Sequence, residues 1–115
     1  MGALLRGRGR RVGRSGPISQ SPPTVDISND ESDFYTIADV AADDRLGLLH
    51  DLTRVIADRG LEIYISKAGR VLDQVTDTFY LKTSDGKKIT DAVVLEALAS
   101  ELRTAARAVT GGGGG

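Results

Sequence analysis

Cysteine is absent from this 115-residue chain, and histidine occurs only once, as His50. Without cysteine the chain has no disulfide, no thiolate metal site and no cysteine nucleophile. A serine–histidine–aspartate triad would have to be built around His50 alone. No apolar run approaches the roughly 20 residues that span a bilayer, so a transmembrane helix is also excluded. The sequence therefore predicts no catalytic residue, no metal site and no cofactor.

The chain length fits a single domain. A content of 40% apolar and 27% charged residues is ordinary for a globular protein. The net charge of −1 hides an uneven distribution, because residues 1–25 contain five arginines and no acid. The remainder contains 10 basic and 16 acidic residues and carries a charge of −6. A basic tail thus precedes an acidic body, which would repel nucleic-acid phosphates.

Residues 1–23 are rich in glycine, arginine, serine and proline and show no apolar periodicity. Such a segment buries too little surface to offset the entropy of ordering, so we expect it to be disordered. An RNA-binding arm, a targeting peptide and a plain interdomain linker are all compatible with this composition. A folded domain is expected over residues 24–110, followed by a flexible glycine tail over residues 111–115.

Apolar patterns in the body predict five elements, in the order strand, helix, strand, strand, helix. The first helix is expected to begin at Leu48 and to end before Gly60, because glycine is favoured just past a helix end. Asp91 is expected to cap the last helix. The second strand alternates apolar and polar residues, which predicts that it is half-buried. The strands are predicted at residues 34–41, 61–67 and 75–83.

This order lacks the last strand of a ferredoxin-like βαββαβ fold, because five glycines stand where that strand is expected. Residues 24–28 alternate like a strand, and a polar loop over residues 29–33 would return them antiparallel beside residues 34–41. The predicted fold class is therefore α+β, a ferredoxin-like sandwich with two helices on one face of a four-stranded antiparallel sheet. An uncovered sheet face or edge predicts a homodimer or pairing with a sister domain.

The stretch from Asp44 to Leu49 crosses from a strand into a helix. Gly47 would let the backbone approach a ligand closely, and a helix start offers free N–H groups to a carboxylate. The ammonium of a small amino acid could then be met by strand-end carbonyls, by Asp43 or by Asp44. In the simpler alternative, Gly47 only makes a tight turn and Asp44 only caps the helix.

The loop Asp44-Arg45-Leu46-Gly47-Leu48-Leu49 resembles the Asp-Arg-Pro-Gly-Leu-Leu signature of ACT domains. Over about residues 24–106 the chain is similar to the C-terminal ACT domain of the bidirectional uridylyltransferases that modify the nitrogen-regulatory PII protein. The catalytic nucleotidyltransferase and hydrolase domains of that family have no counterpart here. Further matching stretches are Val25-Asp26-Ile27-Ser28-Asn29, Gly60-Leu61-Glu62-Ile63, Asp77-Thr78-Phe79-Tyr80 and Gly86-Lys87-Lys88-Ile89.

The resemblance implies a regulatory, non-catalytic domain that senses a small amino acid, glutamine first, in the cytoplasm. In that family a pair of ACT domains senses glutamine and shifts the enzyme between adding and removing uridylyl groups. The implied ligand site lies where the loop of one domain meets a strand of its partner. Its residues would be Asp44, Arg45, Leu46, Gly47, Leu48 and Leu49 of the loop, with Ile63, Tyr64, Ile65 and Ser66 of the strand.

Leu46 stands where proline is usual, and Ala68-Gly69-Arg70 replaces a more apolar strand end. These departures leave open a second interpretation, in which the same fold serves only as a dimerisation module with an empty pocket. An RNA-recognition motif needs glycines that the strand over residues 75–82 lacks. An acylphosphatase-like hydrolase needs an orienting amide beside its phosphate loop, whereas the only asparagine, Asn29, precedes the first predicted strand.

Overall fold

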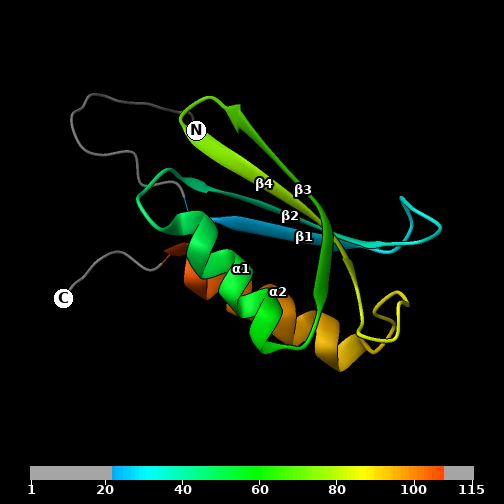
Figure 1. Cartoon of the computed structure of the whole chain (residues 1–115). Helices are drawn as coiled ribbons and strands as arrows, with labels where there is room; N and C mark the ends of the chain where they lie inside the picture. Colours follow the sequence, from blue (N-terminus) through cyan, green and yellow to red (C-terminus); the bar gives the residue numbers. More distant parts are fainter. Residues whose placement is uncertain (1–21, 108–115) are drawn as a thin grey trace, which may run out of the picture.

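The computed structural model describes residues 22–107, so the predicted tails over residues 1–21 and 108–115 lie outside the described part of the chain. The described residues form one four-stranded sheet with both helices packed on the same face (Figure 1). No helix in this part of the chain is long and apolar enough to cross a bilayer. The elements are β1 (Thr24–Ser28), β2 (Thr36–Asp43), α1 (Leu48–Asp58), β3 (Glu62–Val71), β4 (Gln74–Lys82) and α2 (Ala92–Arg107).

The sheet is antiparallel throughout, with the strand order β1-β2-β4-β3. β1 pairs with β2 in a register that puts Val25 opposite Val40, and β2 continues to β4 with Val40 opposite Asp77. The prediction that residues 24–28 fold back beside the next strand is therefore confirmed. β1 occupies the edge position that the last strand of a βαββαβ fold would fill.

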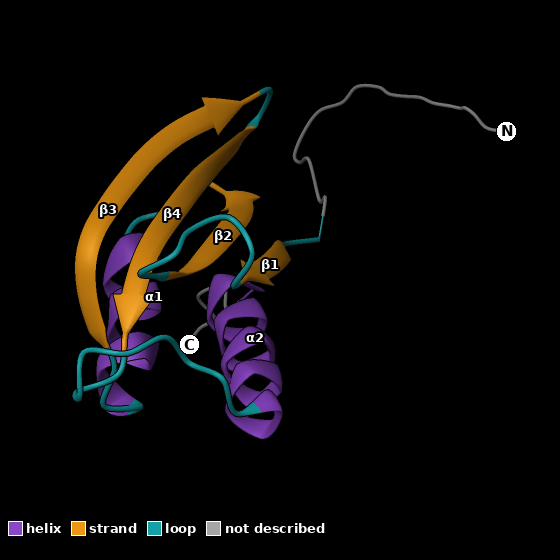
Figure 2. Ribbon diagram, turned by 90° about the vertical axis from the view of Figure 1, so that its right-hand side faces the viewer, coloured by secondary structure: helices purple, strands orange, loops and turns teal. Residues whose placement is uncertain are grey.

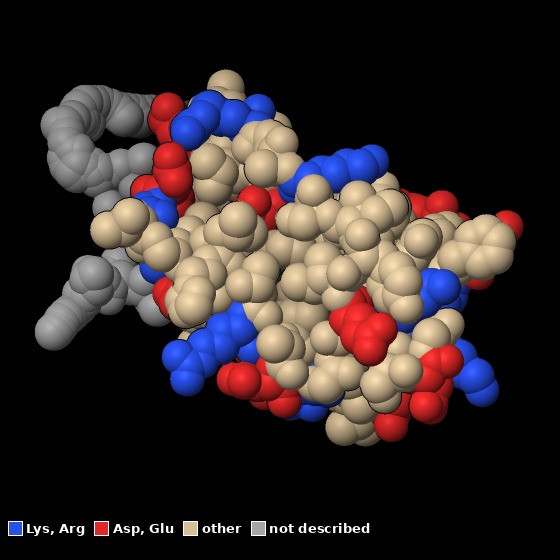
Figure 3. All heavy atoms as spheres, in the orientation of Figure 1, with Lys and Arg blue, Asp and Glu red and all other residues tan. Residues whose placement is uncertain are grey.

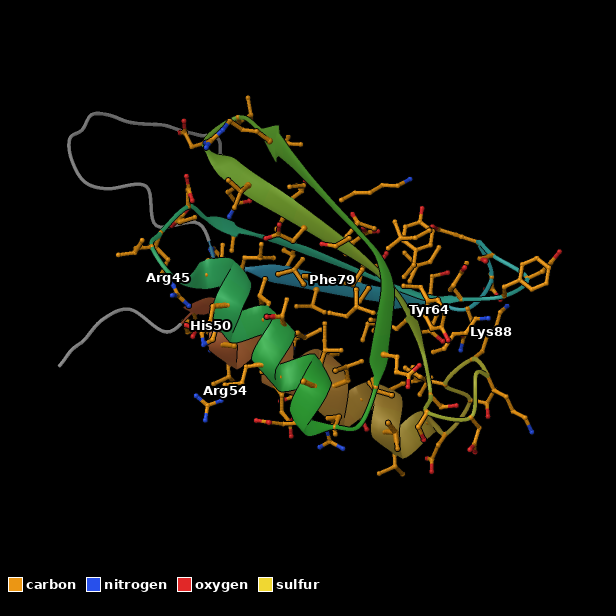
Figure 4. The ribbon with its side chains drawn as sticks, in the orientation of Figure 1. Arg45, His50, Arg54, Tyr64, Phe79 and Lys88 are labelled. Carbon is orange, nitrogen blue, oxygen red and sulfur yellow. The ribbon has the colours of Figure 1, made fainter. Side chains whose placement is uncertain are left out.

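Two apolar helix stripes and the central strands form the core between the layers. Phe79 of β4 is fully buried at its centre, between the sheet and the helices (Figure 4). Arg59, just past α1, donates two hydrogen bonds to the Glu101 carboxylate of α2 at 3.0 and 2.7 Å, and these bonds hold the pKa of Glu101 below its usual value. The fully buried helix residues are Leu52, Ile56, Leu98 and Leu102.

β3 differs most from its prediction. It extends to Val71 instead of ending at Lys67, and all ten of its residues are exposed, so the expectation of a half-buried strand is wrong. The reason is its position at the edge of the sheet, where β3 and part of β4 curve away beyond the helices (Figure 2). Alternation in the sequence identified the strand, but it does not report whether a helix covers one of its faces.

β2 begins at Thr36, two residues later than expected. The backbone N–H groups of Phe34 and Tyr35 both donate to the Ser32 hydroxyl at 3.1 Å, which forms a turn in place of strand pairing. Asp91 accepts a hydrogen bond from the N–H of Val93 at 2.9 Å, as expected of a helix cap before Ala92.

The face of the sheet opposite the helices is partly covered by its own side chains. Tyr35 packs against Tyr64 and Tyr80, with ring centroids 5.7 Å apart in each pair. The ammonium of Lys82 lies 5.0 Å from the rings of Tyr35 and Tyr64, and that of Lys67 lies 5.0 Å from the ring of Tyr80. The outer edge of β3, by contrast, pairs with no other strand among residues 22–107.

A hydrogen-bonded junction joins the end of β1, the start of β2 and the segment before α2. The fully buried Thr36 hydroxyl donates to the Asn29 side-chain oxygen at 2.6 Å and accepts from the N–H of Ile89 at 2.9 Å. The Asn29 amide donates to the carbonyl of Ile89 at 2.8 Å, and Lys88 donates to the Asn29 carbonyl at 2.7 Å. This junction locks β1 in place beside β2.

Replacing Asn29 by alanine is expected to destabilise the domain by about 1–3 kcal/mol, because it leaves the buried Thr36 hydroxyl and the Ile89 carbonyl without their partner. Chemical denaturation of the full chain measures this loss. Asp30→Ala is the matched control, since Asp30 is exposed and adjacent. Equal stability of the two variants would contradict the structural role of the junction.

Candidate ligand-binding site

A cavity of about 650 Å³ opens where β2 turns into α1, a volume in the range that small-molecule sites occupy. One side is the predicted loop and the first turn of α1. The other side comes from β3 and β4. The residues that line the cavity are Asp44, Arg45, Leu46, Gly47, Leu48, Leu49, His50, Ala68, Gly69, Val75 and Asp77.

Gly47 shapes the loop as the sequence predicts. Its φ of +83° is a left-handed conformation that glycine adopts without strain. It is the N-terminal cap residue of α1, and no side chain hydrogen-bonds to the helix start. Asp44 therefore does not cap the helix, and its carboxylate instead accepts a hydrogen bond from Arg70 at 3.2 Å. The N–H of Leu48 donates to the Arg45 carbonyl at 3.2 Å, whereas no hydrogen bond within residues 22–107 takes the N–H groups of Leu49 and His50, which are left for a ligand in the cavity.

Arg45 borders the cavity, but its guanidinium is held elsewhere. It donates to the Ala105 carbonyl of α2 at 2.6 Å and forms an ion pair with Asp51 of α1 at 3.0 Å. Figure 4 shows Arg45 beside the start of α1, with His50 close by on the helix. Arg45 thus fastens the loop to the last turn of α2. Leu46, in contrast, is fully exposed at the tip of the loop.

The sheet supplies a wall of the cavity whose residues were not among the predicted site residues. Ala68 and Gly69 of β3 have small or no side chains, which leaves room beside the loop. Asp77 of β4 is only 6% exposed; burial raises the pKa of its carboxyl above the ordinary 3.8, and the Asp44 carboxylate raises it further. The signal was present in the sequence, because Asp77 is the one charged residue in the alternating set Val75, Asp77, Phe79 and Leu81.

The predicted strand residues Ile63, Tyr64, Ile65 and Ser66 do not line this cavity. Ile63 pairs with Leu81, which in turn pairs with Thr36 at the start of β2, whereas the loop follows the end of β2. Figure 4 shows Tyr64 well to the right of Arg45, toward the other end of the sheet. Within one chain, therefore, the structure brings together the loop half of the predicted site only.

No group of three or more histidine, aspartate or glutamate side chains among residues 22–107 is placed to hold a metal ion. On the face seen in Figure 3, acidic and basic side chains are interspersed among uncharged residues, without the continuous basic stripe that nucleic-acid binding uses. The geometry is that of a small-molecule pocket at a strand-to-helix turn.

The fold and the site define the class of protein: a ferredoxin-like α+β domain with a ligand-sized cavity at its first strand-to-helix turn. The chain belongs to the ACT-like domain family: the family model described as "ACR9-like, ACT-like domain" matches residues 24–108. No solved structure matches the chain.

The chain is similar to several bifunctional uridylyltransferase/uridylyl-removing enzymes. The enzyme of Caulobacter vibrioides (strain NA1000 / CB15N) is 37% identical over 83 residues, which are 72% of this chain and 9% of the relative. That of Ralstonia nicotianae is 37% identical over 98 residues, or 84% of this chain and 11% of the relative. The chain thus spans about a tenth of the length of these enzymes.

Replacing Arg45 by alanine is expected to lower the stability by about 1–3 kcal/mol, because the Ala105 carbonyl and the partly buried Asp51 lose their charged partner. Arg54→Ala is the control. Arg54 and Asp58 are more than 70% exposed and 3.9 Å apart, so their loss changes the stability by less than about 0.5 kcal/mol. Thermal unfolding compares the two, and an Arg45 variant as stable as the Arg54 variant would contradict the fastening role.

Proposed function

We propose that this chain is a non-catalytic regulatory ACT domain that binds a small amino acid, glutamine first, at the Asp44–Leu49 loop. The observation that carries this proposal is the cavity at the Gly47 turn, beside a helix start that no side chain caps. The similarity to uridylyltransferase/uridylyl-removing enzymes supports it, since the match covers most of this chain. The amino acid's carboxylate would bind the N–H groups of Leu49 and His50 in the first turn of α1.

The strand half of the site would come from a partner domain paired along the β3 edge. β3 runs from Glu62 to Val71, so its midpoint lies between Ser66 and Lys67. Opposite side chains of an antiparallel pair lie on the same face of the sheet, so a two-fold axis next to that midpoint, at Ser66, keeps the helices of both copies on one face. This axis sets the partner's Ile65 opposite Lys67, next to Ala68. Because Ala68 lines the cavity, this register brings the predicted strand residues of one copy to the loop of the other.

The exposure of β3 supports the edge as the pairing surface. Its outer edge pairs with no other strand in the described part of the chain, and its side chains are exposed on both faces. A ligand between the loop and a partner strand would stabilise the paired state by the difference between its affinities for the paired and unpaired arrangements. Sensing by this route needs no chemistry in the domain itself.

The second candidate function is a dimerisation module that binds no ligand. The ion pair between Arg70 and Asp44 at the rim of the cavity favours it, because this pair occupies a carboxylate that a ligand could use. Both functions predict dimers, so the response to ligand separates them.

Thermal unfolding of the full chain with each of the twenty amino acids tests ligand binding. A ligand present at a hundredfold over its Kd adds about 2.7 kcal/mol of stability, which is a rise of roughly 10 °C or more for a domain of this size. We expect that rise with glutamine. Flat unfolding curves with all twenty amino acids at millimolar concentration would leave only the dimerisation module.

Two glycine variants control for the site of binding. Gly47→Ala and Gly60→Ala both place a side chain at a positive φ, +83° and +73°, and carry similar backbone strain. Only the Gly47 variant alters the loop that lines the cavity. The glutamine-induced rise is expected to disappear in Gly47→Ala and to persist in Gly60→Ala, and a rise retained by both would place the ligand elsewhere.

Sedimentation velocity tests the pairing edge. Ser66→Glu sets the new carboxylates of the two copies opposite each other at the proposed two-fold axis, so the dimer should dissociate at least about tenfold more readily. Val93→Glu on α2 is the control, because it makes a similar change at a 75% exposed residue away from β3. A wild-type chain that sediments as a monomer with and without glutamine would contradict the homodimer.

A further inference from the structure

Asp77 occupies an unusual position for a carboxylate. It pairs with Val40 of β2 and Ala68 of β3, and it lies on the side of the sheet that faces the helices. It is only 6% exposed to solvent, yet it lines the cavity at the Gly47 turn. Its neighbours on the same side of β4 are Val75 and Phe79. A carboxylate among apolar side chains lowers the stability of the fold unless a hydrogen bond or an opposite charge offsets its lost hydration.

No described residue supplies that partner. Within residues 22–107 no hydrogen bond or ion pair reaches the Asp77 carboxylate, and the charge that acts on it is the like charge of Asp44. The two nearby arginines are engaged elsewhere, Arg45 with Asp51 and Ala105, and Arg70 with Asp44 at the rim. The remaining titratable group of the cavity is His50. Within the described part of the chain, Asp77 is therefore a largely buried carboxyl group without a basic partner.

The cavity has two chemically opposite sides. The start of α1 offers N–H groups and the positive end of a helix dipole to an anion. Asp77, on the sheet side, offers a carboxylate to a cation. A zwitterionic amino acid carries both charges on groups joined through one carbon, and its ammonium has three N–H donors for a buried carboxylate.

We propose that Asp77 selects the ligand of this site: its carboxylate binds the ligand's ammonium and, together with Asp44, excludes amino acids with an acidic side chain. The inference rests on the proposed function and specifies the ligand class. Glutamine and glutamate have nearly the same shape, so the two carboxylates of the cavity distinguish them by charge. N-acetylglutamine keeps the amide and the carboxylate but has no ammonium.

The test compares wild type and Asp77→Asn, as full chains, with glutamine, glutamate and N-acetylglutamine at about pH 7. For wild type we expect a thermal shift with glutamine alone. Asp77→Asn should bind glutamine at least about 30-fold more weakly, because the ammonium loses its charged partner. Asp73→Asn, the same change in the exposed β3–β4 turn, should behave as wild type.

A second readout shows that the variant is folded. In the ligand-free wild type, folding raises the pKa of Asp77 above its ordinary value of 3.8. The domain therefore loses stability as the pH rises above 3.8, and the loss is complete once the pH exceeds the pKa of the folded state. The amide introduced by Asp77→Asn does not ionise, so this variant should unfold at a higher temperature than wild type near neutral pH. This advantage should vanish below about pH 3.8.

The outcomes separate the two proposals. The role of Asp77 is overturned if Asp77→Asn still binds glutamine as wild type does. It is also overturned if wild type binds N-acetylglutamine or glutamate as strongly as glutamine. In both cases the sensing function still stands. Wild type that responds to none of the amino acids overturns both.

If Asp77→Asn does not fold, the pH dependence of glutamine binding by the double variant Asp44→Asn/His50→Gln decides. That variant leaves Asp77 as the one aspartate, glutamate or histidine among the residues that line the cavity, so binding should weaken as acid protonates Asp77, and a flat profile overturns the proposal.

Discussion

The buried junction of Asn29, Thr36 and Ile89 is the interaction on which the arrangement of the domain depends. It ties β1 to the start of β2 and fixes the segment that leads into α2. Once α2 is set across the sheet, its last turn meets Arg45, and Arg45 holds the loop at the far end of β2. One polar cluster at one end of the sheet is thus connected, through a single helix, to the loop that lines the cavity at the other end.

Most of the fold follows from local sequence signals. Helical spacing of apolar residues located α1 and α2, and the positive φ of Gly47 and Gly60 matches what their places at the ends of α1 require. The replacement strand over residues 24–28 was predictable because an edge strand left without a neighbour is unfavourable. These features depend on residues close together in the chain, which is why the sequence alone was sufficient.

The parts of the site that the sequence did not predict depend on contacts between distant segments. Arg45 was expected to face a ligand, but it reaches the Ala105 carbonyl sixty residues away. Asp77 lies at the cavity because β4 lies between β2 and β3, an order that no local pattern specifies. The exposure of β3 reflects the curvature of the sheet beyond the helices, which strand alternation does not encode (Figure 2).

The origin of β1 also affects how the chain folds. Because β1 precedes β2 and is joined to it by the short loop over residues 29–35, the two strands form a hairpin whose contacts are local. A strand that followed α2 would have to close a loop across nearly the whole domain to reach the same position, at a larger entropic cost. Lower contact order speeds folding. During synthesis, moreover, β1 leaves the ribosome before β2, so the strand that covers this edge of β2 is present before the helices are made.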